Sequence, residues 1–311
     1  MSQIHPEGQP ATGEQFTLSR GDSHAVVAAL AGGLRSFTVE GVQLVETYPD
    51  DSIAPSAAGI LLAPWPNRVA DARWTLGGEV QQLDITEPSR GHASHGLLRN
   101  TAYGLVRQTP ECVILQAAIH PQHGWPFHLL HRVSYCLDGA GLRVRQELVN
   151  LSSRSAPAAF GAHPFLRLGD TPTEDLELTV QASARLETDD RLIPTGEVPV
   201  DGGHDLRRGR RVGEMLTDTA YTRLTAEQGE YRHVLRAPDG RSLTLWTDQA
   251  FPYVHVFVTD RFPGRARAVA IEPMTAPANA LNSGEGLLWL DPGAAVGGEW
   301  GIRPGRSTRF P

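Results

Sequence analysis

The chain has 311 residues, of which 40% are hydrophobic and 20% charged, with 32 glycines and 23 prolines. Its formal net charge of −7 argues against nucleic acid as a partner, because a basic protein face supplies most of the affinity for phosphate backbones. All 28 basic residues are arginine, which excludes reactions that require a lysine amine, such as Schiff-base, pyridoxal and Walker-A chemistry.

The first 15 residues are polar and irregular, and they predict a loose N-terminal leader before a single β-sandwich catalytic domain over residues 16–311. The N-terminus lacks the basic and apolar regions of a signal peptide. The longest apolar stretch, near His24, is too short to cross a bilayer. The two cysteines, Cys112 and Cys136, fit a reducing compartment and no disulfide framework. We therefore predict a cytoplasmic protein that binds no membrane.

Short apolar or alternating segments, separated by Gly, Pro and Asp, recur along the rest of the chain. We expect strands over residues 132–137, 142–149, 242–247, 253–258 and 266–271. Apolar and polar residues alternate with period two within 142–149 and 243–247, which is typical of half-buried antiparallel strands. The segments 138–141 and 238–241 predict hairpin turns. No window of a dozen residues has a helical period, so we expect an all-β protein built as one large sandwich.

Polar residues of the types used in catalysis gather in five segments of the sequence. These are Pro64-Trp-Pro-Asn67-Arg68, His92-Ala-Ser-His95-Gly-Leu-Leu-Arg99, Phe160-Gly-Ala-His163-Pro-Phe165, Leu216-Thr-Asp218-Thr-Ala-Tyr221, and Ala270-Ile-Glu272-Pro with the asparagines that follow it. Each has a structural explanation when taken singly. A histidine such as His163 can be a core residue bonded to a backbone carbonyl, and Arg68 can pair with Asp218 because buried charges need partners.

Two kinds of chemistry find little support in these segments. His92 and His95 are three residues apart, and His123 and His128 are five apart, so on strands the members of each pair point to opposite faces. No Cys-x-x-Cys or His-Glu-x-x-His sequence is present, and we predict no metal site. The Gly-x-Ser-x-Gly turn of serine hydrolases is also missing from the sequence.

The five segments together resemble the aldose 1-epimerase (galactose mutarotase) family. Asn67-Arg68, His95-Gly96, His163-Pro164-Phe165, Asp218 and Glu272-Pro273 occur in the order found in that family. The stretches between them are also similar to family landmarks, namely Trp125-Pro126-Phe127, Val149-Asn150, residues 193–196 and residues 290–293. The resemblance spans roughly residues 20–302, nearly the whole chain.

This resemblance implies a large antiparallel β-supersandwich whose groove holds a free hexose and needs no cofactor. The implied reaction interconverts the α and β anomers by acid–base ring opening and reclosure. By resemblance, Glu272 takes the proton of the C1 hydroxyl, His163 serves the ring oxygen, and His95 stabilises the open form. Arg68 and Asp218 hold other hydroxyl groups and Asn67 supports Arg68. Trp65, Trp125 and Phe165 either stack on the sugar or belong to the core.

The identity of the sugar stays open, because this chain has His163-Pro-Phe-Leu-Arg-Leu168 where galactose-type members commonly carry His-Pro-Tyr-Phe-Asn-Leu. One alternative is a hexose-6-phosphate 1-epimerase in which Arg73, Arg99 or Arg167 binds the phosphate. Another is a non-catalytic carbohydrate-binding or sensing protein. In each case we expect a small-molecule sugar as the partner of a monomer or a homodimer.

Overall fold

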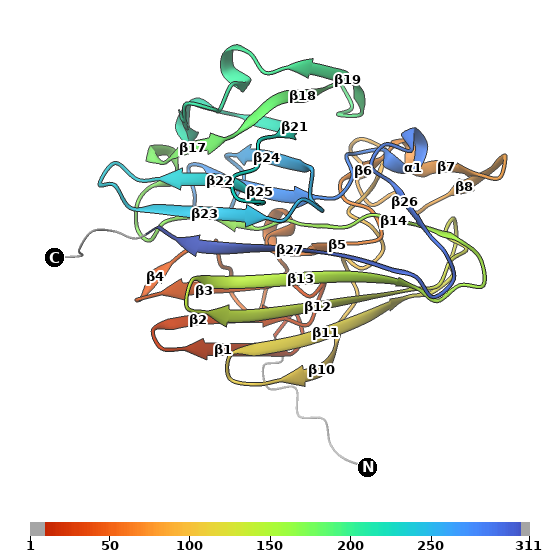
Figure 1. Cartoon of the computed structure of the whole chain (residues 1–311), viewed down its shortest axis with the longest axis horizontal. Coiled ribbons are helices and arrows are strands. Elements are labelled where there is room, and N and C mark those ends of the chain that lie inside the picture. The colour runs from red at the N-terminus through yellow and green to blue at the C-terminus, as the bar shows by residue number, and fades with distance from the viewer. Residues whose placement is uncertain (1–9, 306–311) are drawn as a thin grey trace.

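The computed structural model describes residues 10–305, and nearly all of its regular structure is antiparallel β-strand (Figure 1). The prediction of an all-β antiparallel sandwich is confirmed. Across the larger sheet the nine strands are β10 (Gly104–Gln108), β11 (Cys112–Ile119), β12 (Leu129–Asp138), β13 (Gly141–Asn150), β27 (Ala295–Pro304), β23 (Ser242–Thr247), β22 (Tyr231–Arg236), β17 (Glu177–Val180) and β20 (Arg210–Arg211). Across the eight-stranded sheet they are β19 (Pro194–Pro199), β18 (Ala182–Thr188), β21 (Thr217–Leu224), β24 (Tyr253–Thr259), β25 (Ala268–Met274), β15 (Gly161–Ala162) and β5 (Leu61–Leu62), with β16 (Phe165–Leu166) also paired to β25.

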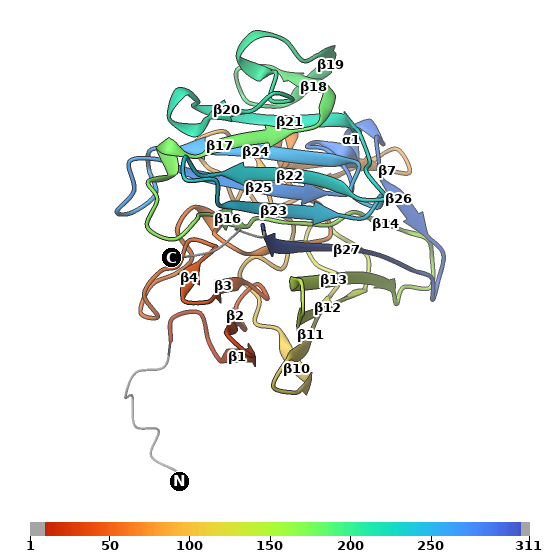
Figure 2. The same cartoon turned by 60° about the vertical axis from the view of Figure 1, so that its left-hand side comes forward.

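Smaller sheets and short helices complete the fold. A four-stranded sheet, β1 (Gln15–Arg20), β2 (Ser23–Ala28), β3 (Leu34–Val39) and β4 (Val42–Gln43), packs beside β11 and β12 (Figure 2). The two-stranded sheets are β6 (Arg68–Val69) with β9 (Ala93–Ser94), β7 (Arg73–Leu76) with β8 (Glu79–Gln82), and β14 (Ala156–Ala158) with β26 (Leu288–Leu290). The 3-10 helices are η1 (Pro55–Ala57), η2 (Ala70–Ala72), η3 (Thr173–Asp175), η4 (Gly202–His204) and η5 (Val212–Glu214), and α1 (Ala280–Ser283) is a single α-helical turn.

The five predicted strands coincide with β12, β13, β23, β24 and β25, although β25 begins and ends later than expected. Both predicted hairpins are present, since Asp138 pairs with Gly141 and Arg236 pairs with Ser242. The carboxylate of Asp138 accepts hydrogen bonds from the backbone N–H groups of Ala140 and Gly141, at 2.7 and 3.1 Å. This side-chain bond is the reason that aspartate favours such turns.

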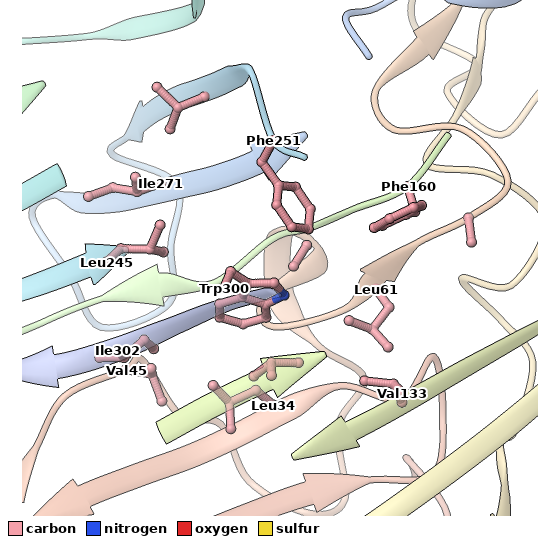
Figure 3. Packing of buried hydrophobic residues seen from close by; sticks show 14 of the residues in the cluster. Leu34, Val45, Leu61, Val133, Phe160, Leu245, Phe251, Ile271, Trp300 and Ile302 are labelled. Atoms are coloured by element: carbon pink, nitrogen blue, oxygen red, sulfur yellow. The ribbon is translucent and has the colours of Figure 1, made fainter. Parts of the chain in front are cut away.

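The two large sheets bury their apolar faces in one cluster that takes in residues from Phe16 to Ile302. Leu245 and Trp300 from the nine-stranded sheet gather there with Ile271 from the eight-stranded sheet (Figure 3). Because side chains alternate along a strand, each core residue of the eight-stranded sheet leaves its neighbours facing away from this cluster.

Strands β24 and β25 show how this alternation creates a second, polar face. On β24, Val254 and Val256 enter the main core, so His255 between them faces the opposite side of the sheet. On β25, Ile271 enters the core and Glu272 faces away. The pairing of β24 with β25 sets His255 directly opposite Glu272. The polar residues therefore meet on one face because the apolar ones are required on the other.

The prediction that the two cysteines form no disulfide is wrong. Cys112 on β11 and Cys136 on β12 are bonded to each other, and they are direct partners in the register of these two strands. The spacing along the sequence carries no sign of this pairing, which follows from the register alone. The bond removes one of the reasons for expecting a reducing compartment.

The predicted leader lies partly outside the described residues, which begin at residue 10. Within the described part of it, Thr12 is buried and the backbone N–H of Ala11 donates to the carbonyl of Asp50. Strand β1 begins at Gln15. Over residues 10–305 no helix is long and apolar enough to cross a membrane.

Candidate active site

The face of the eight-stranded sheet that points away from the main core forms the floor of a polar cavity of about 480 Å³. This size is within the range typical of small-molecule sites. All six predicted site residues line the cavity, namely Asn67, Arg68, His95, His163, Asp218 and Glu272. They come from four loops or short strands and from two long strands, so tertiary structure alone brings them together.

Arg68 is the first residue of β6, and Asn67 precedes it in the loop. Asn67 is buried and has a positive φ of 54°, a conformation that asparagine tolerates better than most residues. Its side-chain oxygen accepts the backbone N–H of Arg68 at 2.9 Å, and its carbonyl accepts the N–H of His95 at 2.9 Å. Asn67 thus links the segment that carries Arg68 to the segment that carries His95.

The His95-Gly96 pair has a steric cause. Gly96 has a φ of 73°, and a Cβ atom at this position would lie 2.0 Å from the carbonyl oxygen of Ala63. Only glycine fits this close approach of two backbones. His95 also has a positive φ, and its ring meets that of His163 edge to face with centroids 5.2 Å apart. Burial, followed by the charges of His163 and nearby arginines, lowers the pKa of His95 well below its usual range.

Arg68 lies between two carboxylates. Its Nε donates to Glu87 at 2.9 Å, and its Nη2 donates to Asp218 at 3.1 Å. Burial alone would raise the pKa of Asp218, but the hydrogen bond and charge of His255, together with Arg68, outweigh it and hold that pKa far below the usual range. Asp218 is therefore an anion at every physiological pH.

His163 and Glu272 form a buried acid–base pair, with Nε2 of His163 3.3 Å from Oε1 of Glu272. Both side chains are at most 5% exposed. Burial lowers the pKa of His163 to about 3. It raises the pKa of Glu272 to about 7, against the opposing effect of the His255 charge. Because burial disfavours both charged forms, the two groups together hold one proton below about pH 7.

Sequence reasoning missed two residues that contact this set. Glu87 lies in a loop before β9 without any motif, and nothing in the sequence points to its contact with Arg68. His255 lies on β24, and its Nε2 is 2.7 Å from Oδ1 of Asp218. The alternation of the predicted strand over 253–258 contained a signal for His255, because it separates the histidine from the valines on either side.

The aromatic residues considered for sugar stacking belong to the core. Trp65, Trp125 and Phe165 are each at most 2% exposed, and none of them lines the cavity. Phe165 stacks beneath His163 with ring centroids 5.3 Å apart. Phe257 is the aromatic residue that lines the cavity, and sequence reasoning did not identify it.

His92, a member of one of the two histidine pairs weighed for a metal, has both ring nitrogens in contact with backbone groups. The Nδ1 of the buried His92 accepts the backbone N–H of Asp71 at 3.1 Å, and its Nε2 is 3.1 Å from the carbonyl of Arg191. His92 therefore fixes loops beside the cavity. No group of three or more potential metal ligands occurs among residues 10–305.

The fold and the cavity together define a β-sandwich protein with a buried acid–base pair in a polar pocket. The family model for aldose 1-epimerase matches residues 14–303, and the chain belongs to this family of isomerases. The uncharacterized protein YihR of Escherichia coli (strain K12) is 30% identical over 283 residues, which cover 91% of this chain and 90% of that protein. The galactose mutarotase of Mus musculus is 28% identical over 210 residues, and the alignment covers 61% of this chain and 59% of that protein.

Solved structures share the fold. A galactose mutarotase-like protein from Clostridium acetobutylicum superposes with a TM-score of 0.82 at 18% identity, covering 94% of this chain and 95% of that one. The galactose 1-epimerase of Lactobacillus acidophilus gives a TM-score of 0.78 at 19% identity, with 94% and 95% covered. The predicted galactose mutarotase-like supersandwich is confirmed.

Proposed function

We propose that this protein is an aldose 1-epimerase that interconverts the α and β anomers of a free hexose. The observation that carries the proposal is the contact between His163 and Glu272 at 3.3 Å on the floor of the cavity. Mutarotation needs one group that takes the C1 hydroxyl proton and another that protonates the ring oxygen. A carboxylate and an imidazole that share one proton can supply both.

In the proposed reaction, the one proton of the pair passes from Glu272 to His163 as the sugar binds, and Glu272 then accepts the proton of the C1 hydroxyl. The electron pair of that O–H bond forms the carbonyl, the bond from C1 to the ring oxygen breaks, and the ring oxygen takes a proton from His163. Rotation about the C1–C2 bond exposes the other face of the aldehyde. The same transfers in reverse close the ring and return both protons. His95 lies beside His163 and donates a hydrogen bond to the open-chain oxygen.

Arg68 and Asp218 supply the groups that orient the sugar. Arg68 is held by two carboxylates, so its position is fixed before the sugar arrives. Asp218 accepts hydrogen bonds from sugar hydroxyls as a permanent anion. A fixed polar set of this kind lowers the entropic cost of alignment.

The optical rotation of freshly dissolved α-glucose and α-galactose tests this proposal. We expect the protein to speed the decay to the unchanged equilibrium rotation of at least one of these sugars. A folded protein that binds the sugars without speeding the decay would favour the non-catalytic sugar-binding alternative. Neither binding nor acceleration would reject free hexoses as substrates.

Two arginines favour a second candidate, an epimerase for a hexose that carries a phosphate. Arg99 and Arg261 line the cavity, and neither makes an ion pair with a carboxylate in the described part of the chain. Of the three arginines named from the sequence only Arg99 lines the cavity, because Arg73 lies on β7 outside it and Arg167 contacts Glu46. The candidate predicts that glucose 6-phosphate raises the melting temperature of the wild type and that Arg99→Gln removes the effect.

The remaining expectations belong to the proposal as well. We propose that residues 16–311 act as one catalytic domain, because the largest buried cluster takes residues from Phe16 to Ile302. A cytoplasmic location and a monomeric or homodimeric state stay predictions.

A further inference from the structure

His255 is a buried histidine on the floor of the cavity to which the proposed reaction assigns no step. It is 6% exposed and lies on β24, directly opposite Glu272 on β25 and Ala220 on β21. Its Nε2 lies 2.7 Å from Oδ1 of Asp218, the shortest contact that either residue makes in the pocket. Its Nδ1 is buried and has no hydrogen-bond partner within residues 10–305.

His255 lies in a cluster of three carboxylates and one arginine. Asp218 and Glu272 face His255 from β21 and β25, and Arg68 and Glu87 complete the chain of ion pairs. If His255 were neutral, ionisation of Glu272 would leave these groups with a net charge of about −2 in a low-dielectric site. A protonated His255 reduces that charge to about −1.

We propose that His255 is a positioning residue of this active site: a buried imidazolium, fixed by Asp218, whose positive charge keeps Glu272 ready to accept the proton of the sugar. The part of this inference that concerns the sugar rests on the proposed function. The part that concerns the charge of His255 does not.

The electrostatics of the pocket support this role. Burial lowers the pKa of His255, but the hydrogen bond to Asp218 and the charges of Glu272 and Asp218 raise it above its ordinary value. The groups that act on His255 are Asp218 from β21, Glu272 from β25, Arg68 from β6, and the neighbouring rings of His95 and His163. Burial leaves the pKa of His95 and His163 low, whereas that of His255 is raised, so His255 is the pocket histidine in which the protonated form is most favoured.

Nuclear magnetic resonance of the histidine ring nitrogens tests the charge directly in the full chain without sugar. The His255 signals are identified as those lost in His255→Gln. At pH 7.5 we expect the pattern of a ring protonated on both nitrogens in the wild type and a neutral ring in Asp218→Asn. A neutral His255 in the wild type would overturn the proposal, whether or not the protein has mutarotase activity.

Kinetics of His255→Gln test the effect on Glu272. His255 and Glu272 are direct partners on neighbouring strands. Removal of a positive charge so close to a carboxyl group raises the pKa of that group by about one unit or more. The high-pH decline of kcat/KM should therefore move up by about one pH unit, and kcat should fall about tenfold or more. The matched control is His233→Gln, a buried strand histidine outside the cavity whose two ring nitrogens also make no hydrogen bond in the described residues.

The control separates a positioning role from a packing role. We expect His233→Gln to keep both the pH profile and kcat of the wild type. If His255→Gln raises KM alone and leaves the pH profile in place, His255 merely shapes the pocket and the proposal is wrong. A wild type that shows no mutarotation, together with a doubly protonated His255, would reject the proposed function and retain the charge assignment.

Discussion

Arg68 and Asp218 are 150 residues apart in the sequence, and their side chains meet through two hydrogen bonds of 3.1 and 3.3 Å. The opposite side of the same guanidinium group contacts Glu87 at 2.9 and 3.3 Å. A planar guanidinium can serve two carboxylates at once, which a lysine ammonium cannot do with the same geometry. The orientation of Asp218 in the pocket therefore depends on an arginine at position 68.

We predict that Arg68→Lys raises KM for the hexose about tenfold, because one of the two paired contacts is lost and Asp218 is held less firmly, mainly by His255. Steady-state polarimetry over a range of sugar concentrations measures this change. Arg107→Lys, an exposed arginine on the edge strand β10, is the control and should leave KM unchanged. An unchanged KM in Arg68→Lys would show that the ion pairs do not orient the sugar.

The shared proton of His163 and Glu272 predicts the pH dependence of the reaction. The reactive form needs one proton on the pair, and the higher pKa of the pair, which burial raises, is about 7 for Glu272. We expect kcat/KM to decline as pH rises above about 7, because the pair then loses the proton that the ring oxygen needs. Rates measured between pH 5 and 9 test this, and a steady rise across that range would contradict it.

Glu272 should also reduce the stability of the fold at high pH. Its pKa in the folded chain, about 7, lies above the ordinary value of 4.5, so folding favours the protonated form. The resulting stability is fully present below pH 4.5 and is lost as pH rises through about 7. We predict that Glu272→Gln is more stable than the wild type at pH 8 by up to about 3 kcal/mol, and that the two are alike at pH 4. Thermal melts at both pH values measure the difference, and equal melting temperatures at pH 8 would contradict this account.

The disulfide between Cys112 and Cys136 gives a prediction that is independent of the active site. It links residues that are 24 positions apart in the sequence. Loop-closure entropy gives such a bond a contribution of about 3 kcal/mol to the free energy of unfolding. We predict that a reducing agent lowers the urea midpoint of the wild type and leaves that of Cys112→Ser unchanged. Alkylation of the unfolded, unreduced protein should label no thiol, and labelling of two would show that the bond is absent.

Much of the fold could be predicted from the sequence because the long strands have a clear period. The alternation of residues 142–149 and the turn at Asp138 define β13 and its hairpin without any tertiary information. Short strands such as β5 and β15 have only two residues each, so they have no period to detect. They form because neighbouring strands offer backbone partners.

The candidate site, like the fold, could be predicted from the sequence only in part. The six residues indicated by the family resemblance all line one cavity. Gly96 and Asn67 allow the tight turns next to His95 and Arg68, and the alternation of side chains along the long strands places Asp218 and Glu272. Glu87 could not be predicted, since its place beside Arg68 depends on how two loops pack. The cysteine pair was missed for a related reason, because register between strands is a property of the folded sheet.

The most direct test of the central claim is the initial rate of optical-rotation change of fresh α-glucose and α-galactose with the wild type, Glu272→Gln and His163→Ala. Positioned acid and base groups typically contribute about 10²–10⁴-fold each. We predict that the wild type speeds the change for at least one of these sugars, and that each variant keeps its fold and loses most of this acceleration. Near-wild-type rates in either folded variant would contradict the role assigned to that residue, and rates unchanged in both would place the chemistry elsewhere in the molecule.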